Sequence, residues 1–201
     1  MIRNLISGVL VIVFALSSSA ADMADDTSLV DRISTMLERH AISEGVFTQQ
    51  IDLHSMTFPI RSSGRFYFHQ DLGIAWYVDQ PIESLTTLTD QGIFADGRVV
   101  DAGSGSRWVV DLLQAMLRGD MQTLTRIFEV HGSADVSGWD LHLVPAEGVL
   151  KRVFRHVDLH GSVSVERVVL TNVNGDRTTI DIKGTNPLVQ LPDDVTQALR
   201  T

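Results

Sequence analysis

The chain has 201 residues, a formal net charge of -9 at pH 7 and no cysteine. This length suits one domain, and the missing cysteine excludes disulfides, thiol nucleophiles and lipid attachment through a thiol. A domain with this excess of acidic groups is a poor match for phosphate backbones and anionic lipid head groups, so nucleic acid is excluded as a partner.

The N-terminus has the three parts of a secretory signal. Arg3 supplies the positive charge, residues 5–16 form the apolar run, and small residues at 18–20 precede a cleavage point. The apolar run is shorter than the roughly 20 residues that span a bilayer, and the alternative is an uncleaved membrane anchor. We therefore expect a cleaved signal peptide at 1–20, a single domain at 21–201 and release of a free chain into a bacterial periplasm.

The first half of the remaining chain predicts one helix followed by short strands. Apolar residues at helical spacing indicate an amphipathic helix over 28–41. Beyond Val46 the pattern alternates as in strands, and turn signals occur at 90–92 and 96–97. The predicted strands are 47–56, 64–70, 74–80, 83–90 and 92–101.

Residues 106–128 have apolar residues at helical spacing, unlike the strand patterns before them, and predict a helical pair between two groups of strands. Gly119 suits the end of the first helix, and Asp120 suits the cap of the second. The apolar face of the first helix consists of Val109, Leu112, Leu113, Met116 and Leu117, and that of the second of Met121, Leu124, Ile127 and Phe128.

Strand patterns resume after Phe128, over 139–146, 150–161 and 164–184. Asn174-Gly175-Asp176 is the strongest hairpin turn signal in the chain. A single sheet that used all of these strands would curl. The predicted fold class is therefore α+β, with one strongly curved antiparallel sheet and helices against its concave face.

Motifs for catalysis and cofactor binding are missing. Ser104 lies in AGSGSRW, which lacks the G-x-S-x-G pattern of a nucleophile elbow, and a flexible lead into the helical pair is the better interpretation. Gly103 and Gly105 form an isolated G-x-G, but Trp108 occupies the position of the third glycine of a dinucleotide site. We expect no enzyme activity and no cofactor.

The histidines are the residues that would most readily bind a metal. His156 and His160 are four residues apart, but on a strand this spacing spans about 13 Å, too far for two imidazoles to share one ion. Four further histidines have no partner at ligand spacing along the chain, namely His54, His69, His131 and His142. We therefore expect no metal site.

The order of several short motifs resembles the LolA family of periplasmic outer-membrane lipoprotein carriers, particularly its LolA-related branch. The resemblance extends over residues 28–192. Its motifs are Phe47-x-Gln49, Pro59, Ser62-Ser63-Gly64-Arg65-Phe66, Gly73-x-x-Trp76 with Pro81, Trp139-x-Leu141-x-Leu143-x-Pro145 and the hairpin VVLTNVNGDRTTIDI.

This resemblance implies an incomplete β-barrel whose helices form a lid over the concave face. It also implies a monomeric carrier that holds acyl chains of a lipoprotein or lipid between an inner-membrane donor complex and an outer-membrane acceptor. The family has a basic residue followed by proline before the strand tryptophan, whereas this chain has no arginine in the corresponding stretch, 69–72. Lid control and cargo can therefore differ, and a dedicated lipid or polyene-type product is an alternative cargo.

Strand alternation and the resemblance together indicate which side chains line the cavity. An ordinary core requires the same pattern, so each of these residues also fits simple packing. The candidates on strands are Phe66, Phe68, Trp76, Val78, Trp139, Leu141 and Leu143, and those on the lid are Leu112, Leu113 and Met116.

Two other functions stay open at this point. The first is a non-catalytic interaction module that docks on a membrane transport complex or on a lipid or polyene biosynthesis complex. Such a module would have a filled core and would bind no acyl chain. The second is a lipid hydrolase that uses Ser104 or a histidine, for which the sequence contains no supporting motif.

Overall fold

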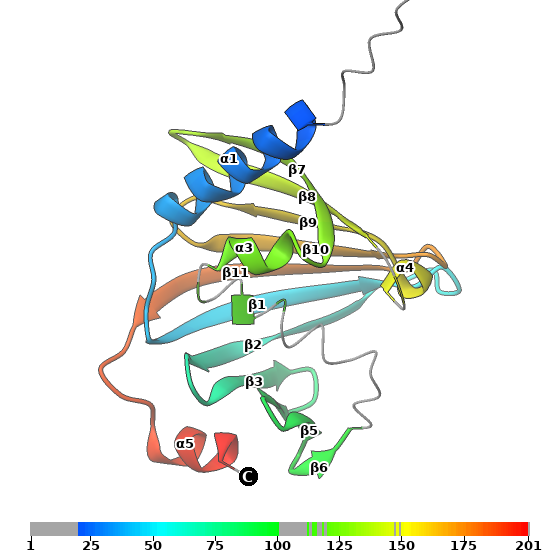
Figure 1. Cartoon of the computed structure of the whole chain (residues 1–201). Helices are drawn as coiled ribbons and strands as arrows, with labels where there is room; N and C mark the ends of the chain where they lie inside the picture. Colours follow the sequence, from blue (N-terminus) through cyan, green and yellow to red (C-terminus); the bar gives the residue numbers. More distant parts are fainter. Residues whose placement is uncertain are drawn as a thin grey trace, which may run out of the picture.

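One antiparallel sheet of 11 strands forms the body of the molecule (Figure 1). The computed structural model describes residues 20–100, 112, 114, 115, 118, 120–146, 148 and 150–200. Every neighbouring pair of strands is antiparallel. The predicted class, α+β with one antiparallel sheet that does not close into a barrel, is confirmed.

Two meanders build this sheet. The first contains β1 (Ile42–Asp52), β2 (Ile60–His69), β3 (Gly73–Gln80), β4 (Ser84–Thr89), β5 (Gly92–Ala95) and β6 (Arg98–Val99). The second contains β7 (Phe128–Asp135), β8 (Gly138–Pro145), β9 (Phe154–Gly161), β10 (Val165–Asn172) and β11 (Arg177–Pro187). Since β1 pairs with β11 in the middle, β6 and β7 lie at the two edges of the described sheet.

Two of the helices with described bounds cover one face of the sheet, which we call the core face. These are α1 (Ala20–Met36) and α3 (Met121–Leu124), which lie against the second meander (Figure 1). Val30 and Ile33 of α1 are completely buried in the same cluster as Leu141 of β8. The predicted capping of α3 is confirmed, because the Asp120 carboxylate accepts a hydrogen bond from the Thr123 backbone N–H.

A third helix, α5 (Asp193–Leu199), packs on the opposite face, which we call the outer face. Its residues Val195 and Leu199 form a cluster with Ala75 of β3. This cover partly desolvates Tyr77, so burial raises the pKa of its phenol and the nearby Asp194 carboxylate raises it further. Thus α1 and α3 cover the core face, while α5 covers the other side of the sheet.

Another described helix, α4 (Leu150–Val153), corrects part of the sequence prediction. The strand pattern predicts that residues 150–153 begin a strand, yet Lys151 and Arg152 are good helix formers and only Leu150 is buried. The helix predicted over 28–41 also differs at both ends, since α1 begins at Ala20 and ends at Met36. Among the described residues, no helix combines the length and apolar character needed to cross a bilayer.

Strand β7 is absent from the sequence prediction, because Gly132 interrupts its apolar alternation. The structure shows why a glycine stands there: a Cβ atom would lie 2.0 Å from the carbonyl oxygen of Asp140 on β8. The predicted helical pair over 106–128 also extends too far, since α3 ends at Leu124 and Phe128 begins β7. The predicted hairpin turn between β10 and β11 is confirmed. Gly175 adopts a φ of 93°, and the Asn172 N–H donates to the Asp176 carbonyl at 2.9 Å.

Candidate functional site

Those predicted cavity-lining side chains that the structure describes converge on the core face. Residues two positions apart on a strand point to the same side, which aligns them across β2, β3 and β8. Phe68 packs with a smaller cluster on β3 and β4, and Trp76 contacts both clusters. The larger cluster contains five of the predicted residues: Phe66, Leu112, Trp139, Leu141 and Leu143.

Most of these side chains are fully buried, but those on β3 are not. Trp76 and Val78 stay partly exposed. The Trp76 indole stacks on Phe47 with ring centroids 3.8 Å apart, and on Phe66 with centroids 5.9 Å apart. Among the described lining residues, the accessible ones are therefore Trp76 and Val78, and the Trp76 indole packs on the buried rings of Phe47 and Phe66.

The predicted lid is only partly within the described residues. Leu112 is 2% exposed and packs into the larger core cluster, on the predicted face. Leu113 and Met116 lie outside the described residues, as does Ser104, the candidate catalytic serine. A role of these three residues stays a prediction.

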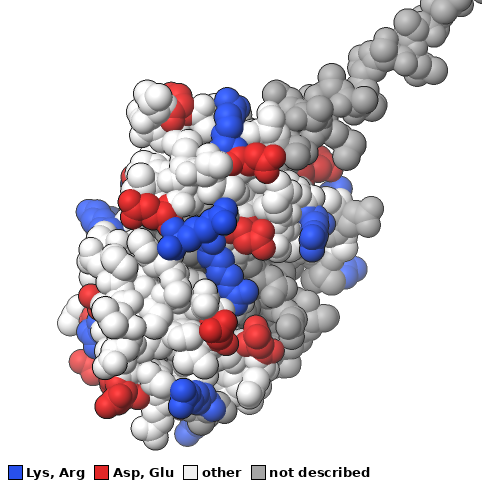
Figure 2. Space-filling model, turned by 60° about the vertical axis from the view of Figure 1, so that its left-hand side comes forward, with Lys and Arg blue, Asp and Glu red and all other residues white. Residues whose placement is uncertain are grey.

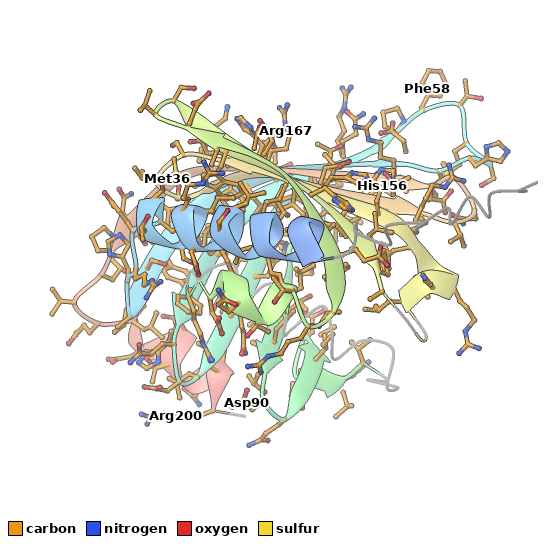
Figure 3. All side chains as sticks on the ribbon, turned by 45° about the horizontal axis from the view of Figure 1, so that its top comes forward. Met36, Phe58, Asp90, His156, Arg167 and Arg200 are labelled. Carbon is orange, nitrogen blue, oxygen red and sulfur yellow. The ribbon has the colours of Figure 1, made fainter. Side chains whose placement is uncertain are left out.

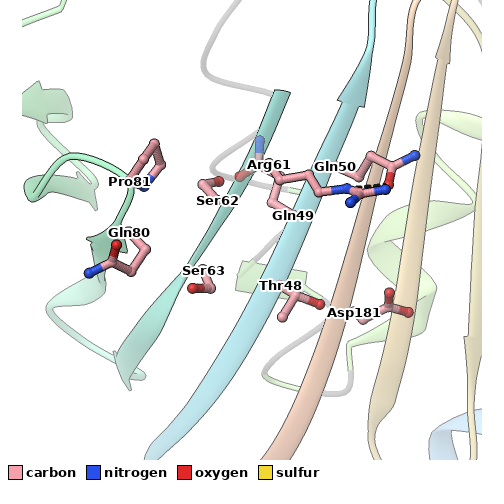
Figure 4. A pocket seen from close by; sticks show the side chains of 9 residues that line it. All are labelled: Thr48, Gln49, Gln50, Arg61, Ser62, Ser63, Gln80, Pro81 and Asp181. Carbon is pink, nitrogen blue, oxygen red and sulfur yellow. Dashed lines mark hydrogen bonds between the residues drawn. The ribbon is translucent and has the colours of Figure 1, made fainter. Parts of the chain in front are cut away.

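A polar hollow of about 390 Å³ lies where β1, β2 and β3 run side by side (Figure 4). Within it the Arg61 Nε–H donates to Gln50 Oε1 at 3.2 Å. None of the predicted lining residues that the structure describes contributes to it, and its polar groups suit water better than an acyl chain. Its lining consists of Thr48, Gln49, Gln50, Arg61, Ser62, Ser63, Gln80, Pro81 and Asp181.

The outer face contains a group of histidines and aspartates that the sequence did not reveal. The register pairs His142 of β8 with Asp158 of β9, and His142 Nδ1 lies 2.6 Å from Asp158 Oδ1. His156 Nε2 lies 3.3 Å from Asp158 Oδ2. His156 and His160 have different partners, because His160 Nδ1 contacts Asp140 at 2.8 Å instead.

The sequence contained one signal for this group. Alternation in WDLHLVP and FRHVDLHG places these polar side chains on the face opposite Leu141 and Leu159. What it lacked was the register between β8 and β9, which brings His142 to Asp158 although they are far apart in sequence. Figure 2 shows acidic and basic side chains interspersed over one side of the molecule.

No protein family and no curated protein sequence matches the chain. Solved structures do match, and a LolA superfamily protein from Nitrosomonas europaea is among them, with 8% identity, a TM-score of 0.42 and coverage of 85% of this chain and 96% of that one. A putative outer membrane lipoprotein-sorting protein domain from Vibrio parahaemolyticus has 7% identity, a TM-score of 0.45 and coverage of 89% and 99%. The MucA/MucB complex from Pseudomonas aeruginosa has 11% identity, a TM-score of 0.42 and coverage of 85% and 60%.

LolA superfamily and lipoprotein-sorting proteins are thus among the structures to which this chain is similar. At identities and TM-scores this low, the likeness concerns the fold and transfers no function to the chain.

Proposed function

We propose that the protein is a periplasmic carrier that binds acyl chains of a lipoprotein or lipid on the core face and shuttles them towards the outer membrane. The signal-like segment 1–20 would deliver it, an inner-membrane complex would load it, and an outer-membrane acceptor would unload it. The observation that supports this proposal is the partly exposed indole of Trp76, which stacks on buried aromatic rings on the face where the described lining residues converge.

Hydrophobic transfer supplies enough free energy for such a role. Each CH₂ group removed from water contributes about 0.8 kcal/mol, so part of an acyl chain already gives useful affinity. Aromatic and aliphatic walls accept varied chains because they impose no directional bonds. Since the β8 part of the core face is filled by its own side chains, the acyl chain is expected to bind at β3, beside Trp76 and Val78.

The test is binding of a dansyl-labelled fatty acid to the mature chain. We expect saturable binding, and a Val78→Asp variant should weaken it roughly tenfold or more, because a charge in an apolar site must be desolvated. Val46→Asp is the matched control, since Val46 is 53% exposed and alternates onto the outer face of β1. Absence of saturable binding, or equal losses in both variants, would contradict the carrier.

A second candidate is the docking module, which a different observation favours. The hairpin between β1 and β2 exposes Met56 (52%), Phe58 (79%) and Ile60 (44%), and Figure 3 shows Phe58 at its tip, away from the sheet. Exposed apolar groups at one end of a molecule are typical of an interaction site. Phe58→Ser should then abolish co-purification with a membrane complex while fatty-acid binding is unchanged, whereas an autonomous carrier would show no such loss.

A further inference from the structure

The carboxylate of Asp158 lies between two imidazoles on the outer face. One oxygen faces His142 Nδ1 at 2.6 Å, and the other faces His156 Nε2 at 3.3 Å. The two rings are 4.8 Å apart at their centroids. Each of the three residues offers one potential ligand atom, and these atoms lie within 4.8 Å of one another.

This arrangement has the donors and spacing that a transition metal needs. Zinc binds imidazole nitrogen and carboxylate oxygen at about 2.0–2.2 Å, which places tetrahedral donors about 3.3–3.6 Å apart. Small side-chain rotations would bring the three donors to that spacing. The backbone needs no change, because His142 and Asp158 are cross-strand partners and His156 shares the strand and face of Asp158.

We propose that His142, His156 and Asp158 form a site for one borderline divalent transition-metal ion, of the class of Zn²⁺, Cu²⁺ and Ni²⁺. Two imidazoles and one carboxylate suit this class. Ca²⁺ and Mg²⁺ prefer several oxygen ligands, and the cluster offers a single carboxylate. The site is independent of acyl binding, since it lies on the face opposite Trp139 and Leu141.

The surroundings favour a cation with an open coordination position. His142 and Asp158 line a hollow of about 440 Å³ on the outer face, so water can complete the coordination. Arg167 also lines this hollow, but its Nε–H donates to Asp181 at 2.6 Å, which compensates its charge. Figure 3 labels His156 and Arg167 on this part of the sheet.

A fourth donor is available on the next strand. His131 of β7 is the register partner of His142 and is exposed. Side chains of directly opposite residues point to the same face, with Cβ atoms about 4.5–5.5 Å apart. A rotation of His131 towards the ion would convert the three-ligand site into a closed one.

Zinc titration of the untagged mature protein, after treatment with EDTA and dialysis, tests the proposal. Competition with a chromophoric chelator should show saturation at about one equivalent per chain. His142→Ala and His156→Ala should each weaken binding roughly tenfold or more, and excess Ca²⁺ or Mg²⁺ should not compete. Acidification should release the ion, because protons compete for the imidazoles.

His160→Ala is the matched control. This histidine shares the strand and face of His156 but pairs with Asp140, outside the cluster. Removal of the His160 imidazole should leave the zinc affinity within about twofold of the parent value. Far-UV circular dichroism should be unchanged for all three variants, because these side chains are at the surface. The proposal is overturned if zinc does not saturate, if His142→Ala and His156→Ala bind as the parent does, or if His160→Ala loses as much affinity.

Discussion

The ring of Phe47 stacks on the indole of Trp76 with centroids 3.8 Å apart and planes inclined by 26°. Phe47 is on β1 and Trp76 is on β3, so the two rings meet over β2. The residue of β2 opposite Phe47 is Gly64, which has no side chain to separate the rings. In the complementary pair, Gly45 of β1 lies opposite Phe66 of β2. Glycines thus make room on the core face for flat aromatic packing.

Alanine substitutions at these two glycines should destabilise the fold by different amounts. A Cβ at Gly64 would lie 1.8 Å from the Tyr77 carbonyl oxygen, whereas one at Gly45 would meet the Phe66 ring at 2.6 Å. A backbone atom in a ladder cannot move aside, so Gly64→Ala should lower the free energy of unfolding by about 3 kcal/mol or more, and Gly45→Ala by about 1–3 kcal/mol. Urea denaturation measures both. Equal stability of Gly64→Ala and the parent would refute the close approach of β2 and β3.

Truncation to alanine should change the free energy of unfolding by very different amounts at two phenylalanines. Phe66 is 1% exposed in the core, and Phe66→Ala should cost about 3–5 kcal/mol. Phe58 stands 79% exposed at the hairpin tip, and Phe58→Ala should change the free energy of unfolding by no more than about 0.5 kcal/mol. Thermal and urea unfolding of the two variants compare them directly. A loss above about 1 kcal/mol in Phe58→Ala would mean that its ring is packed against the protein.

Tryptophan fluorescence can locate bound acyl chains. In a Trp108→Phe background, which removes the third tryptophan of the chain, a brominated fatty acid should quench the partly exposed Trp76, because quenching requires close approach. Trp76→Phe should therefore lose most of the quenching while it keeps an aromatic ring at β3. In Trp139→Phe the quenching should persist, since Trp139 is buried and its Nε1–H donates to the Ser162 carbonyl at 2.8 Å. The reverse result would place the acyl chain near β8.

The carboxylate of Asp176 joins two hairpin loops. It accepts the His54 backbone N–H at 2.8 Å and the Asn174 side-chain N–H at 2.7 Å, and these hydrogen bonds lower its pKa below the ordinary 3.8. Asn174→Ala should raise the pKa of Asp176 towards that value, as measured by a carboxyl NMR titration. An unchanged titration would show that Asn174 does not hold the carboxylate.

The lowered pKa of Asp176 also makes the stability of the folded protein depend on pH. Because the folded-state pKa lies below the unfolded one, the contribution of Asp176 to stability is present above about pH 4 and is lost as the pH falls through the folded value. The contact between the β1–β2 loop and the β10–β11 turn should therefore loosen in acid. Amide hydrogen exchange at His54 should be faster below about pH 4 than the change of pH alone produces. Such an excess would demonstrate the loss of this contact.

Local patterns in the sequence determined much of this protein. Alternation in GRFYFHQ was enough to place Phe66 and Phe68 on one face and Tyr67 on the other, because side chains alternate along any strand. The hairpin at 174–176 was predictable because its turn chemistry lies within three residues. Where local signals conflicted, as at Gly132 and at 150–153, the prediction was wrong.

Only the tertiary structure decided which segments meet. The pairing of β1 with β11 joins strands from opposite ends of the chain, and no local pattern encodes that choice. The same holds for the register that brings His142 to Asp158, and for the placement of α5 on the outer face. Burial likewise separated the packed Trp139 from the partly exposed Trp76, although both fit one alternating pattern. The physical reason is that pairing, register and burial depend on contacts between distant segments, which the whole fold optimises together.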